Sequence, residues 1–162
     1  MKRMIIYAAI LAASLMVPIK GTDVGKLKPV EVVQLYKMGQ TVVIATDTGD
    51  SGRGLTVEAA FENLEETTSG NIFLDTADYL LLSAGAMKEA EELRGYLKKS
   101  TRVCIAEMNI DTAEAAEYLK VHRPETVLRD LKNLQIAEVL TKDNGRLIMK
   151  QRNNLKMIEN SS

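Results

Sequence analysis

The residues best suited to chemistry are concentrated between positions 46 and 54, in the sequence Thr-Asp-Thr-Gly-Asp-Ser-Gly-Arg-Gly. Asp47-Thr48-Gly49 has the sequence of the triplet that supplies the catalytic carboxylate of aspartic proteases, and here too it follows an apolar segment. Gly49-Asp50-Ser51-Gly52 has the sequence of the loop that carries the serine nucleophile of trypsin-like proteases. The segment therefore raises two proteolytic hypotheses, which differ in the other residues and in the fold that they require.

The serine-protease hypothesis fails because the chain lacks both a suitably placed histidine base and the required all-β fold. A serine nucleophile needs a histidine base that is oriented by a carboxylate. The one histidine is His122, which lies just before Pro124 at the expected end of a helix. Trypsin-like proteases also need two all-β barrels, and 162 residues with several expected helices are too few for them. We interpret His122 instead as a helix C-terminal residue, where the protonated form is favourable.

The aspartic-protease hypothesis remains as the enzymatic alternative, with Asp47 as the catalytic residue. In small dimeric enzymes of this class each subunit supplies one carboxylate, and the two share a proton. That fold is nearly all β, whereas in this chain a helix is expected to begin at Thr56, close behind the triplet. We therefore expect a protein that is not an enzyme, and we keep the protease as the minor alternative.

The same segment could also bind a small ligand or a partner. Glycines between a strand and a helix resemble a phosphate loop, but no Lys follows Gly54, and Asp47 and Asp50 would repel phosphate. The two aspartates also lack the ligand spacing of an EF-hand, so we expect no metal and no cofactor. The simplest interpretation is a strand-to-helix turn built from glycine, aspartate and serine. The ligand or partner hypothesis involves five residues of the 46–54 loop: Asp47, Thr48, Asp50, Ser51 and Arg53.

The N-terminus has the pattern of an export signal. Residues 1–21 begin with Lys2 and Arg3, continue with an apolar stretch over residues 4–17, and reach Pro18. This stretch is shorter than the ~20 residues of a membrane-spanning helix and fits the ~7–15 residues of a secretory apolar region. We expect a signal peptide or an uncleaved membrane anchor, and hence an extracytoplasmic protein that is secreted or held at the membrane. No cysteine stands directly after the stretch, so a lipoprotein anchor is excluded.

Composition narrows the remaining possibilities. The net charge of −1 gives no basic surface for nucleic acid. Cys104 is the single cysteine, which excludes a disulfide framework and a cysteine-based metal site, and its strand-like surroundings predict burial. The core must be aliphatic, because the chain has no Trp and two Phe. The length fits one domain, which we place at residues 22–157, followed by a frayed tail at 158–162.

The hydrophobic pattern predicts an α+β domain with a mixed β-sheet and three to four packed helices. Hairpins are expected at both ends, over residues 30–47 and 139–150, the second with a turn at Asp143-Asn144-Gly145. Between them, helices and strands should alternate, as in other domains whose helices pack on a sheet. Helices are expected at 56–70, 87–99, 112–121 and 125–134, and strands at 71–74, 80–83 and 102–108.

The segment that begins at Gly54 resembles a known family. Gly54, Thr56, Glu58-Ala59 and the apolar run 80–82 that ends near Gly85 occur in the order found in the N-terminal domain of Ger(x)C-type spore germination proteins. The helix expected at 87–99, the strand "RVCIAEM" and the segment "AAEYLKVHRPE" continue that order, so that the resemblance covers about residues 40–133. These proteins are the C subunits of nutrient germinant receptors in endospore-forming bacteria.

The resemblance implies a non-enzymatic receptor component that works with membrane subunits and carries no catalytic residues. Its partners would be envelope or spore-membrane proteins, with membrane contact through residues 1–21 if these are not cleaved. The chain departs from the family in three respects: it lacks the lipid-anchoring cysteine, the N-terminal Trp-Asp element and two further domains. A related protein of this kind would be a short stand-alone form.

Overall fold

A β-hairpin forms where the alternating apolar residues predict it. In the computed structural model, which describes residues 27–108, 110–131 and 136–152, strand β2 (Val32–Met38) pairs antiparallel with β3 (Thr41–Thr46). The two-residue link between them contains Gly39 at φ 64°, a conformation that glycine adopts without steric cost. The hairpin predicted over residues 30–47 is confirmed.

A second hairpin occupies the segment that was expected to be a loop. The prediction of a 46–54 loop is wrong, because β4 (Ser51–Gly54) pairs antiparallel with β3 and leaves only the turn at 47–50. Glycine is a poor strand former, and two glycines among four residues hid this strand from the sequence pattern. Helix α2 (Val57–Thr67) follows, and its N-cap is Thr56, as predicted: the Thr56 side chain accepts a hydrogen bond from the Ala59 N–H.

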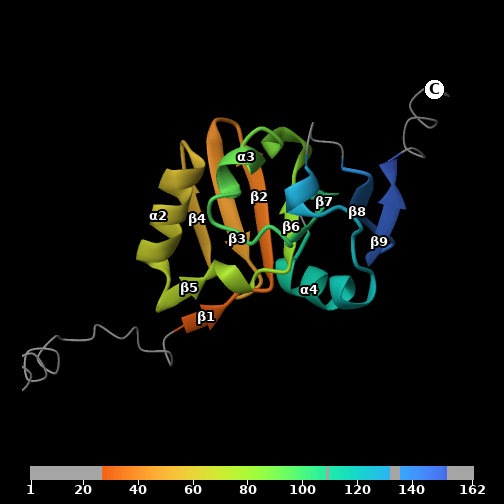
Figure 1. Cartoon of the computed structure of the whole chain (residues 1–162), viewed down its shortest axis with the longest axis horizontal. Coiled ribbons are helices and arrows are strands. Elements are labelled where there is room, and N and C mark those ends of the chain that lie inside the picture. Colours follow the sequence, from red (N-terminus) through yellow and green to blue (C-terminus); the bar gives the residue numbers. More distant parts are fainter. Residues whose placement is uncertain (1–26, 109, 132–135, 153–162) are drawn as a thin grey trace, which may run out of the picture.

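The chain then builds a seven-stranded sheet in the order β4-β3-β2-β6-β7-β8-β9. Strands β2, β6 (Tyr79–Leu82), β7 (Arg102–Ala106) and β8 (Glu138–Asp143) run parallel, whereas β3, β4 and β9 (Arg146–Gln151) pair antiparallel with their neighbours. A separate two-stranded sheet joins β1 (Leu27–Pro29) to β5 (Asn71–Phe73) in parallel. The mixed sheet and its helices form a single α+β domain, as predicted (Figure 1).

The turn between β8 and β9 has the residues that its geometry demands. Asn144 and Gly145 both have positive φ, at 49° and 79°, and pairing continues up to Asp143 and Arg146 on either side. This conformation at both central residues of a two-residue hairpin is the reason for the Asn-Gly preference. The C-terminal hairpin and its turn are therefore confirmed.

Helices cover both faces of the sheet. On one face, α2 and the short α3 (Ala90–Leu93) pack on residues of β2, β3, β6 and β7 (Figure 1). On the other, α4 (Thr112–Val121) packs on β2, β6, β7 and β8. The chain passes from the second face to the first between α4 and β8, since Leu128 and Leu131 belong to the α2–α3 side. Both cores are largely aliphatic, as the composition predicts.

Two predicted helices are wrong in extent. Of residues 87–99, only the four of α3 form an α-helix, preceded by the 3₁₀ turn η3 (Ala84–Ala86), and Gly95 disfavours continuation. Of residues 125–134, the described part forms the 3₁₀ turn η4 (Leu128–Asp130). The chain ahead of η4 is held extended, because Thr126 and Val127 bond to the start of β7. Backbone pairing with the sheet therefore competes successfully with helix formation.

Helix α4 is confirmed, with Asp111 as its N-cap, but its buried face differs from the expected one. It buries Ala115 beside Ala116 and Leu119, whereas Ala113 is exposed. The export signal at 1–21 and the frayed tail at 158–162 lie outside the described residues. Among the helices of the described residues, none combines the length and the apolar character needed to cross a membrane.

Candidate functional site

Asp47 holds the beginning of strand β2. Its Oδ1 accepts hydrogen bonds from the backbone N–H groups of Glu31 (3.1 Å) and Val32 (3.2 Å), and Oδ2 lies 3.3 Å from the Glu31 nitrogen. The Asp47 N–H in turn donates to the Val32 carbonyl at 3.2 Å. A charged acceptor makes such bonds stronger than neutral ones. These contacts assign the Asp47 carboxylate to the support of the β2 backbone, which is a structural role.

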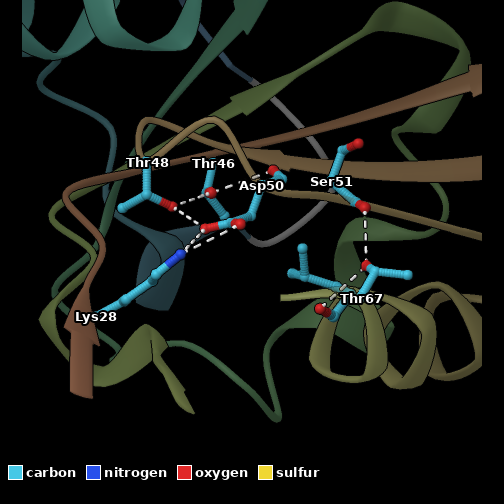
Figure 2. Close-up of polar contacts among 7 residues, drawn as sticks. Lys28, Thr46, Thr48, Asp50, Ser51 and Thr67 are labelled. Carbon is cyan, nitrogen blue, oxygen red and sulfur yellow. Dashed lines mark hydrogen bonds and ion pairs between the residues drawn. The ribbon is translucent and has the colours of Figure 1, made fainter. Parts of the chain in front are cut away.

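Asp50 lies in a separate network with Thr48 and Lys28 (Figure 2). The Thr48 hydroxyl donates to Asp50 Oδ2 at 2.7 Å, and the Lys28 ammonium lies 3.3 Å from the same oxygen. Thr46 continues the network, with its hydroxyl 2.8 Å from that of Thr48. The hydrogen bond from Thr48 holds the pKa of Asp50 below its ordinary value; partial burial opposes this effect, and Lys28 adds to it. The network joins β1 to the turn before β4.

Ser51 and Arg53 lie on the outer face of β4. Both side chains are exposed, and they alternate with Gly52 and Gly54, which face helix α2. The same helix contacts their backbones: the Arg53 N–H donates to Asn63 Oδ1 at 2.9 Å, and the Thr67 hydroxyl, which donates to the Asn63 carbonyl at 2.7 Å, lies 3.5 Å from the Ser51 carbonyl oxygen (Figure 2). The five predicted residues therefore fall into three groups. Asp47 bonds to the start of β2, Thr48 and Asp50 form the network with Lys28, and Ser51 and Arg53 lie on β4.

Gly52 and Gly54 are needed for the contact between β4 and α2. A Cβ added to Gly52 would lie 2.1 Å from the Ala60 carbonyl oxygen and 2.4 Å from the Leu64 nitrogen. A Cβ added to Gly54 would lie 2.4 Å from the Ala60 nitrogen. The helix backbone therefore rests directly on the strand backbone. This close approach accounts for Gly52, the last residue of the Gly-Asp-Ser-Gly sequence, whereas Gly49 has a positive φ of 83° in the turn.

His122 stands at the end of α4, as predicted. It is the C-cap residue, and its N–H donates to the Tyr118 carbonyl at 3.0 Å. Its ring stacks on that of Tyr118, with a centroid separation of 4.4 Å. His122 therefore serves as a helix C-terminal residue. Within the described ranges, no hydrogen bond joins it to Ser51.

Cys104 is buried in β7, also as predicted. The side chain is 0% exposed. Burial raises the pKa of the Cys104 thiol to about 12, and the neighbouring Glu138 carboxylate adds to the increase. Glu138 is itself buried, and its two oxygens accept from the Glu125 N–H (2.8 Å) and the Thr126 hydroxyl (3.2 Å). The thiol is thus protonated and inaccessible, and the buried carboxylate fastens the chain that leads to η4.

A cleft of about 530 Å³ lies at the carboxyl ends of β6 and β7, away from the predicted loop. The Lys37 ammonium at its border is paired with Glu89 Oε1 at 2.7 Å. Sequence reasoning missed this cleft, although a signal existed: Lys37, Ser83 and Glu107 each follow an apolar strand segment. Its lining includes Lys37, Ser83, Ala84, Ile105, Met108 and Val139.

Metal-ligating residues do not cluster in the part of the chain that the structure describes: no group of three His, Cys, Asp or Glu side chains there could hold a metal ion. Comparisons of the chain with protein families, with characterised proteins and with solved structures found no match.

Proposed function

We propose that this chain is a non-enzymatic, extracytoplasmic accessory domain related to the C subunits of nutrient germinant receptors. It would act by contact with envelope or spore-membrane proteins and would be secreted or held at the membrane by residues 1–21. The observation that carries the proposal is the use of the two aspartates in the protease-like segment. Asp47 is engaged by the backbone of β2, and Asp50 by Thr48 and Lys28.

The arrangement of the elements also supports the proposal. Gly54 ends β4, Thr56 caps α2, and the apolar run 80–82 lies in β6. The α3 segment and β7 follow in the order that the resemblance implies. The residues that carry the resemblance therefore belong to consecutive elements of one structural unit, in which β4 and α2 are in direct contact.

A genetic complementation experiment tests both parts of the proposal. In the endospore-forming host that the proposal requires, deletion of the gene should slow the germination of spores in response to nutrients. A full-length copy should restore the wild-type rate, and a copy without residues 2–21 should not, because the product would stay in the cytosol. Cell fractionation of the two complemented strains provides the matched control for location.

The outcomes separate the role from the location. Germination at the wild-type rate in the deletion strain, with the receptor otherwise intact, would remove the germination role. Recovery of the full-length product from the cytosol with residues 1–21 intact would remove the extracytoplasmic location. Direct contact with the receptor is measured separately: the full-length protein is purified from the membrane fraction, and a membrane subunit of the receptor should co-purify with it.

A further inference from the structure

The cleft at the carboxyl ends of β6 and β7 lies where parallel sheets bind their ligands. Leu35, Leu82, Ile105 and Val139 stand in one register row across the four parallel strands. The cleft lies on the carboxyl-terminal side of this row, where β6 leads into η3 and β7 leads into residues 107–108. Ligands of α/β sheets bind outside the carboxyl ends of the strands, and pockets of roughly 300–1,000 Å³ suit small organic molecules.

The floor and one wall of the cleft are apolar. Ile105 and Val139 are half-buried on the face of the sheet that carries α3, and Met108 at the rim is 55% exposed. Gly85 also lines the cleft and is exposed, and a Cβ built on it would meet no atom within 4 Å, so the space beside this residue is open. The interior would therefore accept the apolar body of a small molecule.

The cleft lining contains one buried hydroxyl without a hydrogen-bond partner and one lysine with donors to spare. Ser83 lines the cleft and is 6% exposed, and its hydroxyl has no hydrogen-bond partner among the described residues. Lys37 uses one of its three N–H donors on Glu89, which leaves donors for another acceptor. A buried hydroxyl without a partner costs about 1–3 kcal/mol, so a ligand oxygen that accepts from Ser83 would relieve this cost.

The charges in and beside the cleft select an uncharged ligand. The Lys37 ammonium is already neutralised by the Glu89 carboxylate, and Glu107 adds a further negative charge to the lining. An anionic ligand would therefore meet a site with excess negative charge. A cationic ammonium group has no lone pair to accept a hydrogen bond from Ser83 or Lys37, and it would lie beside the Lys37 ammonium. A carbonyl oxygen accepts hydrogen bonds from both Ser83 and Lys37 without adding a charge.

We propose that this cleft binds a small uncharged organic molecule with an apolar body and a carbonyl oxygen. The apolar body lies on Ile105 and Val139, and the carbonyl accepts hydrogen bonds from the Ser83 hydroxyl and the Lys37 ammonium. This site is distinct from the loop at 46–54. It also does not depend on the receptor-accessory role proposed above, because it follows from the cleft alone.

Two fluorescent probes of similar size test the ligand class. Prodan is an uncharged aromatic ketone, and anilinonaphthalene sulfonate is its anionic counterpart. Prodan should bind the full-length protein saturably at one site with a blue-shifted emission, and at least tenfold more tightly than the sulfonate. Hexanamide should displace it at lower concentration than hexanoate or hexylamine. Absence of saturable Prodan binding, or tighter binding of the sulfonate, would overturn the proposal.

Variants locate the binding within the cleft. Gly85→Leu fills the open space and should weaken Prodan binding at least tenfold, whereas the control Gly85→Ala should change it less than threefold. Ser83→Ala removes the hydroxyl and should weaken binding about fivefold, with circular dichroism and thermal unfolding showing an intact fold. If Gly85→Leu and Ser83→Ala both bind Prodan as tightly as the wild type, the probe binds elsewhere and the assignment of this cleft is wrong.

Discussion

The contact between β4 and α2 provides the sharpest structural prediction, because Gly52 leaves no space for a side chain. In Gly52→Ala, the new Cβ would lie 2.1 Å from the Ala60 carbonyl oxygen, 2.4 Å from the Leu64 nitrogen and 2.6 Å from the Leu64 Cβ. Two of these three atoms belong to the helix backbone, so no rotation of a side chain relieves the clash. Helix α2 would have to move away from the strand by more than about 1 Å to restore ordinary van der Waals contact.

The expected cost of Gly52→Ala follows from that displacement. Overpacking that forces backbone movement costs about 1–3 kcal/mol. The movement would also strain the hydrogen bond from the Arg53 N–H to Asn63 Oδ1, which has a net contribution of about 1 kcal/mol. We expect the free energy of unfolding to fall by about 2–4 kcal/mol, a large share of the ~5–15 kcal/mol typical of a domain.

Urea denaturation followed by circular dichroism measures this loss, with two controls. Gly85→Ala introduces the same methyl group where no atom lies within 4 Å, and it should change the stability by less than about 1 kcal/mol. Ser51→Ala alters the neighbouring residue on the outer face of β4 and should be nearly neutral, within about 0.5 kcal/mol. A Gly52→Ala protein as stable as the Gly85→Ala control would show that α2 does not rest on β4 in this way.

Two further predictions concern titratable groups. Cys104 should resist alkylation by iodoacetamide at pH 8 in the native protein and react fully in urea, because burial raises its thiol pKa to about 12. Intact-mass spectrometry detects the adduct. Rapid labelling of the native protein would contradict the burial of this side chain. Asp50 has a lowered pKa in the folded protein, so its stabilising contribution is present above its ordinary value of 3.8 and is lost as the pH falls through the lower folded value. The stability difference between wild type and Asp50→Asn should therefore shrink below about pH 4 in denaturation experiments, and a constant difference down to pH 2 would refute the assignment.

Local sequence signals predicted those elements whose formation depends on local chemistry. The Gly39 link, the Thr56 and Asp111 caps and the Asn144-Gly145 turn each place a residue type where its backbone or side chain is needed. The order of strands in the sheet was not predictable in the same way. The segment that crosses between α4 and β8 is held by the buried Glu138 carboxylate, which accepts hydrogen bonds from Glu125 and Thr126.

The candidate site shows the same division. The polar residues at 46–54 were identified from the sequence, but their division among β2, the turn and β4 depends on pairing that no short motif encodes. The strand β4 was missed because Gly52 and Gly54 are present for helix contact rather than for strand propensity. The cleft was missed because Ser83, Ile105 and Val139 come together only once β6, β7 and β8 are placed side by side.

The central claim is that Asp47 serves the fold rather than catalysis, and a single pair of variants tests it. Asp47→Ala leaves the N–H groups of Glu31 and Val32 without their acceptor and should lower the free energy of unfolding by about 2 kcal/mol. Asp47→Asn, which keeps an acceptor oxygen, should lose about half as much. The decisive measurement is hydrolysis of a casein substrate at acid pH by the purified protein, with and without pepstatin. If Asp47 serves the fold alone, no form of the protein shows pepstatin-sensitive hydrolysis; hydrolysis by the wild type that disappears in a folded Asp47→Asn protein would contradict this role.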